Sequence, residues 1–289
     1  MAVIIDGKTI AKKTRENLKK EVEELRKSGI TPLAVIMVGN NPASKVYVKN
    51  KSKACDEVGI EYEEYILEEN IKQEQLKNLI EKLNKDNTIN GILLQSPLPA
   101  NLDINEAIKK IDYNKDVDGF HPMNIGKLVL GQDTFVSCTP YGIMRLFEEY
   151  KIELSGKNVV ILGRSNIVGK PLMQCCINKN ATVTVCHSKT KEIEQKEREA
   201  DILITAIGKP NFIKAENVKK VIIDVGINRL ETGKIVGDVD FEEVSKKASY
   251  ITPVPGGVGP MTIAMLINNV IKATKQQSKT SSNKIEKWK

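Results

Sequence analysis

The sequence predicts an α/β protein made of two domains. The chain has 289 residues, which is enough for two domains of ordinary size. Short apolar runs that favour strands alternate with longer segments in which apolar residues recur at helical spacing. This alternation is typical of parallel sheets covered by helices. Hydrophobic residues make up 40% of the chain and charged residues 28%, an ordinary mixture for a globular protein.

The first domain is expected to span residues 1–140. Apolar residues at near-helical spacing predict a helix over about 10–25, and an apolar strand follows at 33–38. A helix at 44–58 is expected to begin at Ser44, because a serine hydroxyl often accepts a backbone hydrogen bond at the start of a helix. The elements that follow are a strand at 62–67, a helix at 73–83 and a strand at 91–95.

The second domain is expected over 141–269. Glycines follow several of its strands, and open α/β sheets bind their ligands at those strand ends. This pattern predicts a doubly wound parallel sheet of the Rossmann type. An apolar run predicts a last helix near 261–275 that returns to complete the first domain. The five strand candidates lie at 158–162, 182–186, 201–206, 221–225 and 249–252.

The most informative segment runs from Gly163 to Pro171, directly after the strand at 158–162. A strand that ends on glycine just before a helix directs unpaired backbone N–H groups and a positive helix end at a phosphate. The spacing departs from G-x-G-x-x-G, because Ser165 stands at the middle position. It is not a Walker A loop either, because Lys170 is followed by proline and not by Ser or Thr. The segment therefore indicates a dinucleotide site.

The end of the next strand favours NADP over NAD. A chain that binds NAD usually places an acid about 20 residues past the glycines. Here the strand at 182–186 is followed by His187, Ser188 and Lys189. Together with Arg164 in the glycine turn, this polar and basic end could receive the 2′-phosphate of NADP. The alternative is that Arg164 is an ordinary solvated loop residue.

The net charge of +7 does not indicate a nucleic-acid partner. Residues 272–289 contain six lysines and one acid, so five of the seven charges lie in this stretch. Its composition predicts that 276–289 is a disordered, solvated tail.

No targeting or metal-binding pattern is apparent. No stretch approaches the roughly 20 apolar residues that span a bilayer, and the N-terminus lacks the basic start of a signal peptide, so we expect a cytoplasmic protein. Five scattered cysteines and two histidines favour neither disulfides nor a metal site.

Six short sequence motifs follow one another in a specific order. Together they extend over nearly the whole chain except the tail. They are Tyr-x-x-x-Lys at 47–51, Gln-Ser-Pro-Leu-Pro at 95–99, Lys-Asp-Val-Asp-Gly-Phe-His-Pro at 115–122, Cys-Thr-Pro at 138–140, Gly-Arg-Ser-Asn-Ile-Val-Gly-Lys-Pro at 163–171 and Pro-Val-Pro-Gly-Gly-Val-Gly-Pro-Met-Thr at 253–262. With them the chain resembles the bifunctional methylenetetrahydrofolate dehydrogenase and methenyltetrahydrofolate cyclohydrolase family. Ser96, where leucine is usual, and Met123, where an aromatic residue is common, depart from its pattern.

This resemblance implies a folate site in an active-site cleft between the two domains, and it implies NADP as the cofactor and a homodimer. Lys51 would be the catalytic lysine, with Gln95 as its polar partner. Tyr47 would stack on the aminobenzoate ring, and Asp118 would anchor the pterin. The remaining implied contacts are Pro255, Gly256 and Gly257 for the substrate, and Gly163, Arg164, Ser165, Ser188 and Ile227 for the cofactor.

The implied chemistry needs few acid–base groups. Loss of a hydride from 5,10-methylenetetrahydrofolate leaves a stabilised methenyl cation, so this step requires positioning and no proton transfer. Hydration of the methenyl carbon to 10-formyltetrahydrofolate does require proton transfer, which Lys51 can perform when it is neutral. Gln95 can bond to Lys51 without adding a negative charge that would keep it protonated.

Several alternatives remain open. A tyrosine and a lysine four residues apart on a helix are usually a surface pair, Gln95 could merely cap its strand, and both Asp116 and Asp118 could be turn formers. We keep the turn reading for Asp116. The enzyme could also be a monofunctional or an NAD-dependent dehydrogenase. Outside catalysis, a nucleotide sensor or an RNA-binding protein that uses the basic tail would bind ligand without turnover.

Overall fold

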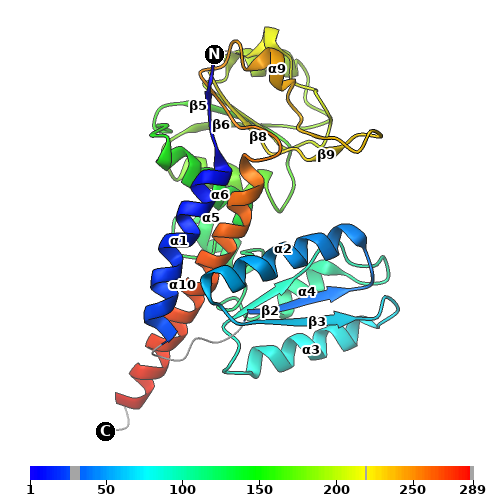
Figure 1. Cartoon of the computed structure of the whole chain (residues 1–289), viewed down its shortest axis with the longest axis vertical. Coiled ribbons are helices and arrows are strands. Elements are labelled where there is room, and N and C mark those ends of the chain that lie inside the picture. Colours follow the sequence, from blue (N-terminus) through cyan, green and yellow to red (C-terminus); the bar gives the residue numbers. More distant parts are fainter. Residues whose placement is uncertain (27–32, 219, 287–289) are drawn as a thin grey trace. The chain divides into compact units, whose positions relative to one another are not determined.

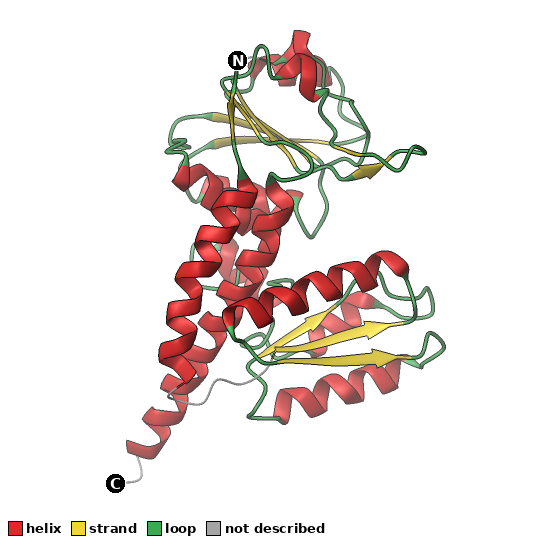
Figure 2. Cartoon of the chain, viewed as in Figure 1, coloured by secondary structure: helices red, strands yellow, loops and turns green. Residues whose placement is uncertain are grey.

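The computed structural model describes residues 1–26, 33–218 and 220–286 (Figure 1). The chain divides into two compact units. One contains Met1–Lys12 and Ser137–Met265, and we call it the six-stranded unit. The other contains Lys13–Val136 and Leu266–Lys289, and we call it the three-stranded unit. Each is an α/β structure built on a parallel sheet, as the sequence predicts (Figure 2).

Within the six-stranded sheet of this unit, every pairing between neighbouring strands is parallel. Leu162 pairs with Cys186 and with Thr205, and Thr205 pairs with Asp224, so the carboxyl ends of four strands are in register at one edge. In spatial order, the strands are β1 (Val3–Ile4), β11 (Tyr250–Ile251), β8 (Val221–Asp224), β7 (Ile202–Thr205), β5 (Asn158–Leu162) and β6 (Thr182–Cys186).

Helices and a hairpin connect these strands. The core beneath them is aliphatic and includes Leu162, Leu203 and Ile222, which are nearly inaccessible to solvent. The connecting elements are α6 (Cys138–Glu149), α7 (Gly169–Ile177), α8 (Ile193–Glu199), a 3-10 turn (Ala215–Asn217), the antiparallel pair β9 (Asn228–Arg229) and β10 (Ile235–Val236), and α9 (Phe241–Val244).

The three-stranded unit has the strand order β3-β2-β4, again all parallel. Figure 1 shows α2 on one side of this sheet and α3 on the other. All six residues of β2 are buried, as expected for a central strand covered on both faces. The elements are β2 (Leu33–Val38), α2 (Pro42–Val58), β3 (Tyr62–Leu67), α3 (Gln73–Lys85), β4 (Gly91–Leu94), α4 (Ile104–Lys110) and α5 (Pro122–Val129).

Two long helices contribute residues to both units: α1 (Gly7–Arg26) and α10 (Val258–Glu286). Within the three-stranded unit, Lys275 of α10 forms an ion pair with Glu21 of α1, with 2.5 Å between Nζ and Oε2. The chain therefore enters this unit twice, each time through one of two helices that this ion pair joins. In the described ranges, no helix combines the length and hydropathy that crossing a membrane requires.

The domain boundaries differ from the prediction at the N-terminus. We expected the first domain to include residues 1–140, but residues 1–12 belong to the six-stranded unit. The reason is the two-residue strand β1, in which Val3 pairs with Tyr250 and Ile4 with Ile251. A strand of two residues has no periodicity that could reveal it, and its partner lies near the other end of the chain.

The expected helix start at Ser44 is also wrong. The Oδ1 atom of Asn41 accepts hydrogen bonds from the backbone N–H groups of Ala43 (3.0 Å) and Ser44 (3.1 Å), and Pro42 occupies the first helical position. Asparagine and a following proline are strong start signals. Ser44 is buried instead, and its hydroxyl faces the Ser96 carbonyl oxygen at 3.5 Å.

The predicted disordered tail is corrected for 276–286, because α10 continues as a helix to Glu286; residues 287–289 lie outside the described residues. The side chain of Gln277 explains why the helix does not end near 275. Its amide accepts a hydrogen bond from Asn90 Nδ2 (3.0 Å) and donates to the backbone oxygens of Asn90 (2.8 Å) and Asn114 (3.3 Å). The composition of the tail gives no sign of these specific contacts.

We expect Gln277→Ala to lower the free energy of unfolding by about 1–3 kcal/mol, because Asn90 is buried and loses its partners. Chemical denaturation measures the change. Gln195→Ala is the matched control, since it removes only an exposed hydrogen bond to Glu199 (2.8 Å). Equal stability of the two variants would contradict a docked α10.

Candidate active site

Lys51 and Gln95 meet in the three-stranded unit, as predicted. Lys51 lies on α2, and Gln95 follows β4 directly. The Nζ atom of Lys51 donates a hydrogen bond to Gln95 Oε1 at 3.0 Å. Gln95 is 8% exposed, and its backbone N–H donates to the Ile36 oxygen of the neighbouring strand at 2.8 Å. The sheet therefore holds the backbone of Gln95, and the side-chain amide of Gln95 holds Lys51.

The Ser96 carbonyl fixes the orientation of the Gln95 amide. Gln95 Nε2 donates to this oxygen at 2.6 Å, which leaves Oε1 to face Lys51. The flipped amide would place its N–H groups against the ammonium and its oxygen against a carbonyl. Lys51 thus has an uncharged acceptor whose direction is determined by the backbone.

Tyr47 and Asp118 also lie in this unit. Tyr47 is one helical turn before Lys51 on α2, and its side chain is 46% exposed. Its ring is therefore available to an aromatic ligand. Asp118 is half-buried in the segment that follows the bridge between Ile92 and Asp116.

Asp116, which we interpreted as a turn former, has a more extensive structural role. It is 2% exposed, and its Oδ2 atom accepts hydrogen bonds from His121 N (2.8 Å) and Asn124 Nδ2 (2.8 Å). Asn124 is held in turn by the Thr134 hydroxyl at 2.8 Å. This buried network fixes the loop that carries Asp118. The sequence signal for this role was an acidic residue five positions before the His-Pro pair at which a helix begins.

Lys115 is a second buried group that the sequence did not single out. Its Nζ atom donates to three backbone oxygens at the C-terminus of α3: Leu83 (3.0 Å), Asn84 (2.8 Å) and Asp86 (2.8 Å). These carbonyls have no helical partner of their own, and a cation satisfies them and the helix dipole together. Burial lowers the pKa of Lys115.

In the six-stranded unit, the glycine turn after β5 is tightly packed. Gly163 has φ +117°, and a Cβ there would lie 2.5 Å from the Ala206 oxygen. A Cβ at Gly169 would lie 2.1 Å from the Gly163 oxygen. The Ser165 hydroxyl accepts hydrogen bonds from Val168 N (3.1 Å) and Gly169 N (3.4 Å) at the start of α7. Glycine is therefore required at both ends of this turn, and the Ser165 hydroxyl holds the backbone N–H groups that lead into α7.

The other predicted cofactor residues lie after neighbouring strands at the same edge. Main-chain hydrogen bonds join these strand ends: Gly163 N to the Cys186 oxygen (2.9 Å), and Ala206 N to the Leu162 oxygen (2.8 Å). The structure thus brings the turns after β5, β6, β7 and β8 together, as predicted. Among the predicted cofactor residues in these turns, Arg164, Ser188 and Ile227 are exposed, Ile227 to 54%.

Pro255, Gly256 and Gly257 lie in the six-stranded unit, whereas the other predicted substrate residues lie in the three-stranded unit. Their loop packs on the start of α1. Lys8 N donates to the Gly256 oxygen at 2.8 Å, and a Cβ at Gly7 would lie 1.8 Å from the Gly257 oxygen. The glycines permit this close backbone contact.

No group of three or more potential metal-ligating His, Cys, Asp or Glu side chains occurs within the described ranges. All five cysteines are buried, and none of them forms a disulfide in these ranges. Burial raises the pKa of Cys55, Cys175 and Cys176 to about 12, so these thiols stay protonated near neutral pH.

We expect ionisation of the Asp116 carboxyl to lower the free energy of unfolding as the pH rises. Burial raises the pKa of this carboxyl above 3.8 in the folded protein, so above about pH 4 the unfolded chain releases the proton first and unfolding becomes easier. In Asp116→Asn, the free energy of unfolding should therefore fall less than in the wild type between about pH 4.5 and pH 7. Asp56→Asn, at an exposed position of α2, is the control. Parallel pH profiles for the Asp116 variant and the wild type would contradict this expectation.

Comparison with protein families gives two matches. Residues 5–118 match the catalytic domain of tetrahydrofolate dehydrogenase/cyclohydrolase, and residues 137–278 match the NAD(P)-binding domain of the same family.

Similar proteins cover nearly the whole chain. The bifunctional protein FolD of Acetivibrio thermocellus is 56% identical over 281 residues, which are 96% of this chain and 99% of that protein. The crystal structure of the bifunctional FolD enzyme from Campylobacter jejuni is 53% identical, with a TM-score of 0.94, and covers 96% of this chain and 100% of its own. The Trypanosoma brucei dehydrogenase-cyclohydrolase complexed with NADP and an inhibitor is 37% identical, with a TM-score of 0.91 and coverages of 96% and 98%. The chain therefore belongs to the tetrahydrofolate dehydrogenase/cyclohydrolase family.

Proposed function

We propose that this protein oxidises 5,10-methylenetetrahydrofolate with NADP and then hydrolyses 5,10-methenyltetrahydrofolate to 10-formyltetrahydrofolate. The observation that carries the proposal is the 3.0 Å hydrogen bond between Lys51 and Gln95, in a chain that belongs to this family. Oxidation needs a positioned substrate, and hydration needs a positioned amine. The two residues supply the amine together with an uncharged partner.

In the oxidation, the residues of this chain position the substrate. NADP supplies the hydride acceptor when it is bound. Tyr47 offers an exposed ring for stacking on the aminobenzoate group, and Asp118 can accept hydrogen bonds from the amino edge of the pterin. No proton leaves the substrate in this step, so no general base is required.

In the hydration, Lys51 handles the proton. Water oxygen forms a bond to the methenyl carbon while neutral Lys51 Nζ takes the proton. The bond from that carbon to N5 then breaks while the hydroxyl proton of the adduct passes to N5, so the oxygen becomes the formyl oxygen and the formyl group stays on N10. Gln95 holds Nζ in place, and because it carries no charge it does not favour the ammonium form.

The cofactor residues are proposed from their place at the strand ends. Gly163 and Ser165 shape the turn at the start of α7, where a phosphate is favoured by the helix dipole. Arg164 is an exposed residue of this turn, and Ser188 follows β6, where the sequence has no acid that would repel a 2′-phosphate. These residues favour NADP over NAD.

We further propose that the three-stranded unit binds the folate and the six-stranded unit binds NADP, in a cytoplasmic homodimer. The family profiles divide the chain in the same way, into a catalytic region over 5–118 and an NAD(P)-binding region over 137–278. The product, 10-formyltetrahydrofolate, is a formyl donor of the kind that purine biosynthesis consumes.

Replacing Lys51 should separate the two activities. We expect Lys51→Met to lower the cyclohydrolase rate by a factor on the order of 10²–10⁴, the usual effect of removing a positioned acid–base group. The dehydrogenase rate should fall less, because hydride transfer involves no proton. Both rates are measured on one preparation by methenyltetrahydrofolate and NADPH absorbance.

Lys53→Met, the same change at an exposed position of α2, controls for loss of a helix lysine. Gln95→Glu should move the cyclohydrolase pH profile upward, since a carboxylate stabilises the ammonium. Undiminished cyclohydrolase activity in Lys51→Met would remove this lysine from the mechanism.

Arg164 should discriminate between the two cofactors. We expect Arg164→Ala to weaken NADP by about 1.5–3 kcal/mol, the cost of losing a charged hydrogen bond to the 2′-phosphate, and to leave NAD nearly unaffected. Titration with each cofactor measures the difference. Arg145→Ala on α6, which breaks ion pairs with Glu148 and Glu149, is the control. Equal weakening of NADP and NAD would show that Arg164 does not contact the 2′-phosphate.

A further inference from the structure

The carboxylate of Asp238 is fully buried and binds the loop that follows β7. Its Oδ2 atom accepts hydrogen bonds from the Thr205 hydroxyl (3.1 Å) and from the backbone N–H groups of Ile207 (2.8 Å) and Gly208 (3.2 Å). Its Oδ1 atom accepts one from Lys209 N at 2.9 Å. Three consecutive N–H groups therefore converge on one carboxylate, a cradle that fixes the path of the backbone.

The same carboxylate also holds the loop that follows β8. Oδ1 accepts a hydrogen bond from Asn228 Nδ2 at 3.0 Å, one residue after Ile227. A Cβ at Gly226 would lie 2.2 Å from Oδ1, so only glycine allows the loop to pass this close to the carboxylate. Asp238 thus joins two loops at the edge where Arg164 and Ser188 lie.

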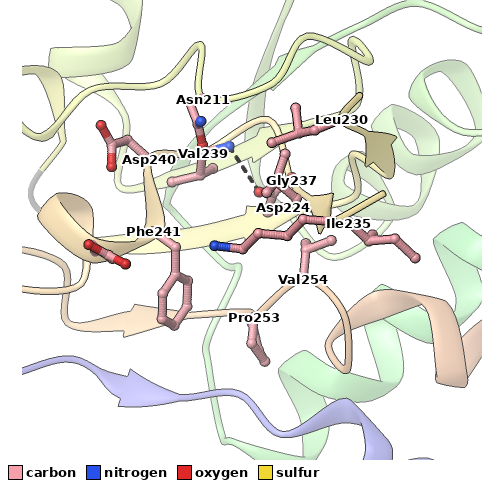
Figure 3. Close-up of a pocket in the computed structure, with 13 residues that line it drawn as sticks. Asn211, Asp224, Leu230, Ile235, Gly237, Val239, Asp240, Phe241, Pro253 and Val254 are labelled. Carbon is pink, nitrogen blue, oxygen red and sulfur yellow. Dashed lines mark hydrogen bonds between the residues drawn. The ribbon is translucent and has the colours of Figure 1, made fainter. Parts of the chain in front are cut away.

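A second buried carboxylate, Asp224, orients the first. It accepts hydrogen bonds from Gly226 N (2.9 Å) and Asp238 N (3.0 Å) through Oδ1, and from Val239 N (2.9 Å) through Oδ2. Figure 3 shows the last of these as a dashed line. A Cβ at Gly237 would lie 1.8 Å from Oδ2, so the backbone passes directly over this carboxylate. Burial raises the pKa of Asp224 to about 7.

We propose that Asp238 is a positioning residue for the dinucleotide: it fixes the loops at 206–209 and 226–228 against each other, and Asp224 holds it in place. The proposal rests on the proposed cofactor site, to which Ile227 belongs. All five donors that the structure describes for Asp238 are uncharged. Its role is therefore that of an acceptor that fixes loop geometry.

An amide cannot replace this carboxylate. In Asp238→Asn, one of the two oxygens becomes an N–H₂ group, which donates only. If it takes the Oδ1 place, it faces the donors of Lys209 and Asn228. If it takes the Oδ2 place, it faces those of Ile207 and Gly208. Two N–H donors lose their acceptor in either orientation, and the loops must move to satisfy them.

The test measures KM for NADP, KM for methylenetetrahydrofolate and the NADP-independent cyclohydrolase rate on the same preparation. We expect Asp238→Asn to raise KM for NADP roughly tenfold or more, the effect of unsatisfied buried donors. The folate KM should change much less. The cyclohydrolase rate reports the folded fraction, because that reaction needs no NADP. Asp240→Asn is the matched control, since Asp240 pairs only with Lys214 at the surface (3.1 Å) among its described ion pairs.

Exchanging the two side chains provides the second test. In Asp238→Asn with Asn228→Asp, the new carboxylate accepts from the new amide, so KM for NADP should recover part of its rise. Recovery of KM for NADP at a constant cyclohydrolase rate would support positioning, because a change in the folded fraction would alter the cyclohydrolase rate as well. The proposal is overturned if the Asp238 variant loses both activities equally and the exchange restores nothing, or if its KM for NADP equals that of Asp240→Asn. Failure of the wild type to bind NADP would instead overturn the cofactor assignment.

Discussion

Parallel strand pairing is the constraint on which the six-stranded unit depends. When neighbouring strands run in the same direction, every loop that follows a strand emerges at one edge of the sheet. The register of Leu162, Cys186, Thr205 and Asp224 makes four such loops adjacent. Loops that begin more than sixty positions apart in the sequence are therefore neighbours at one edge of the sheet.

Buried polar groups then give these loops their shape. Lys115, Asp116, Asp224 and Asp238 are all nearly inaccessible, and a buried charge without partners is costly. Each is satisfied mainly by backbone groups of a loop or a helix end. The same hydrogen bonds that compensate burial hold the backbone in one conformation. Loops next to a ligand site can be ordered in this way without a hydrophobic core of their own.

The local sequence pattern was sufficient to predict most strands that are covered on both faces. The strands β2 and β5 contain apolar runs of four or more residues that end just before a glycine, and their bounds agree with the prediction. The strand β1 was missed because two residues carry no period. The start of α2 was misplaced because Asn41 and Ser44 are both good caps, and only packing determines which of them faces inward.

By itself, the sequence determined the fold class, the family and the residue types needed for the chemistry, because glycine spacing, apolar runs and short motifs are properties of neighbouring residues. Only the tertiary structure decided which side chains meet. The docking of Gln277 and the joining of two loops by Asp238 each link residues that are distant in sequence or whose role the composition does not indicate. Such contacts depend on strand register and on how helices pack, and neither can be read from a local pattern.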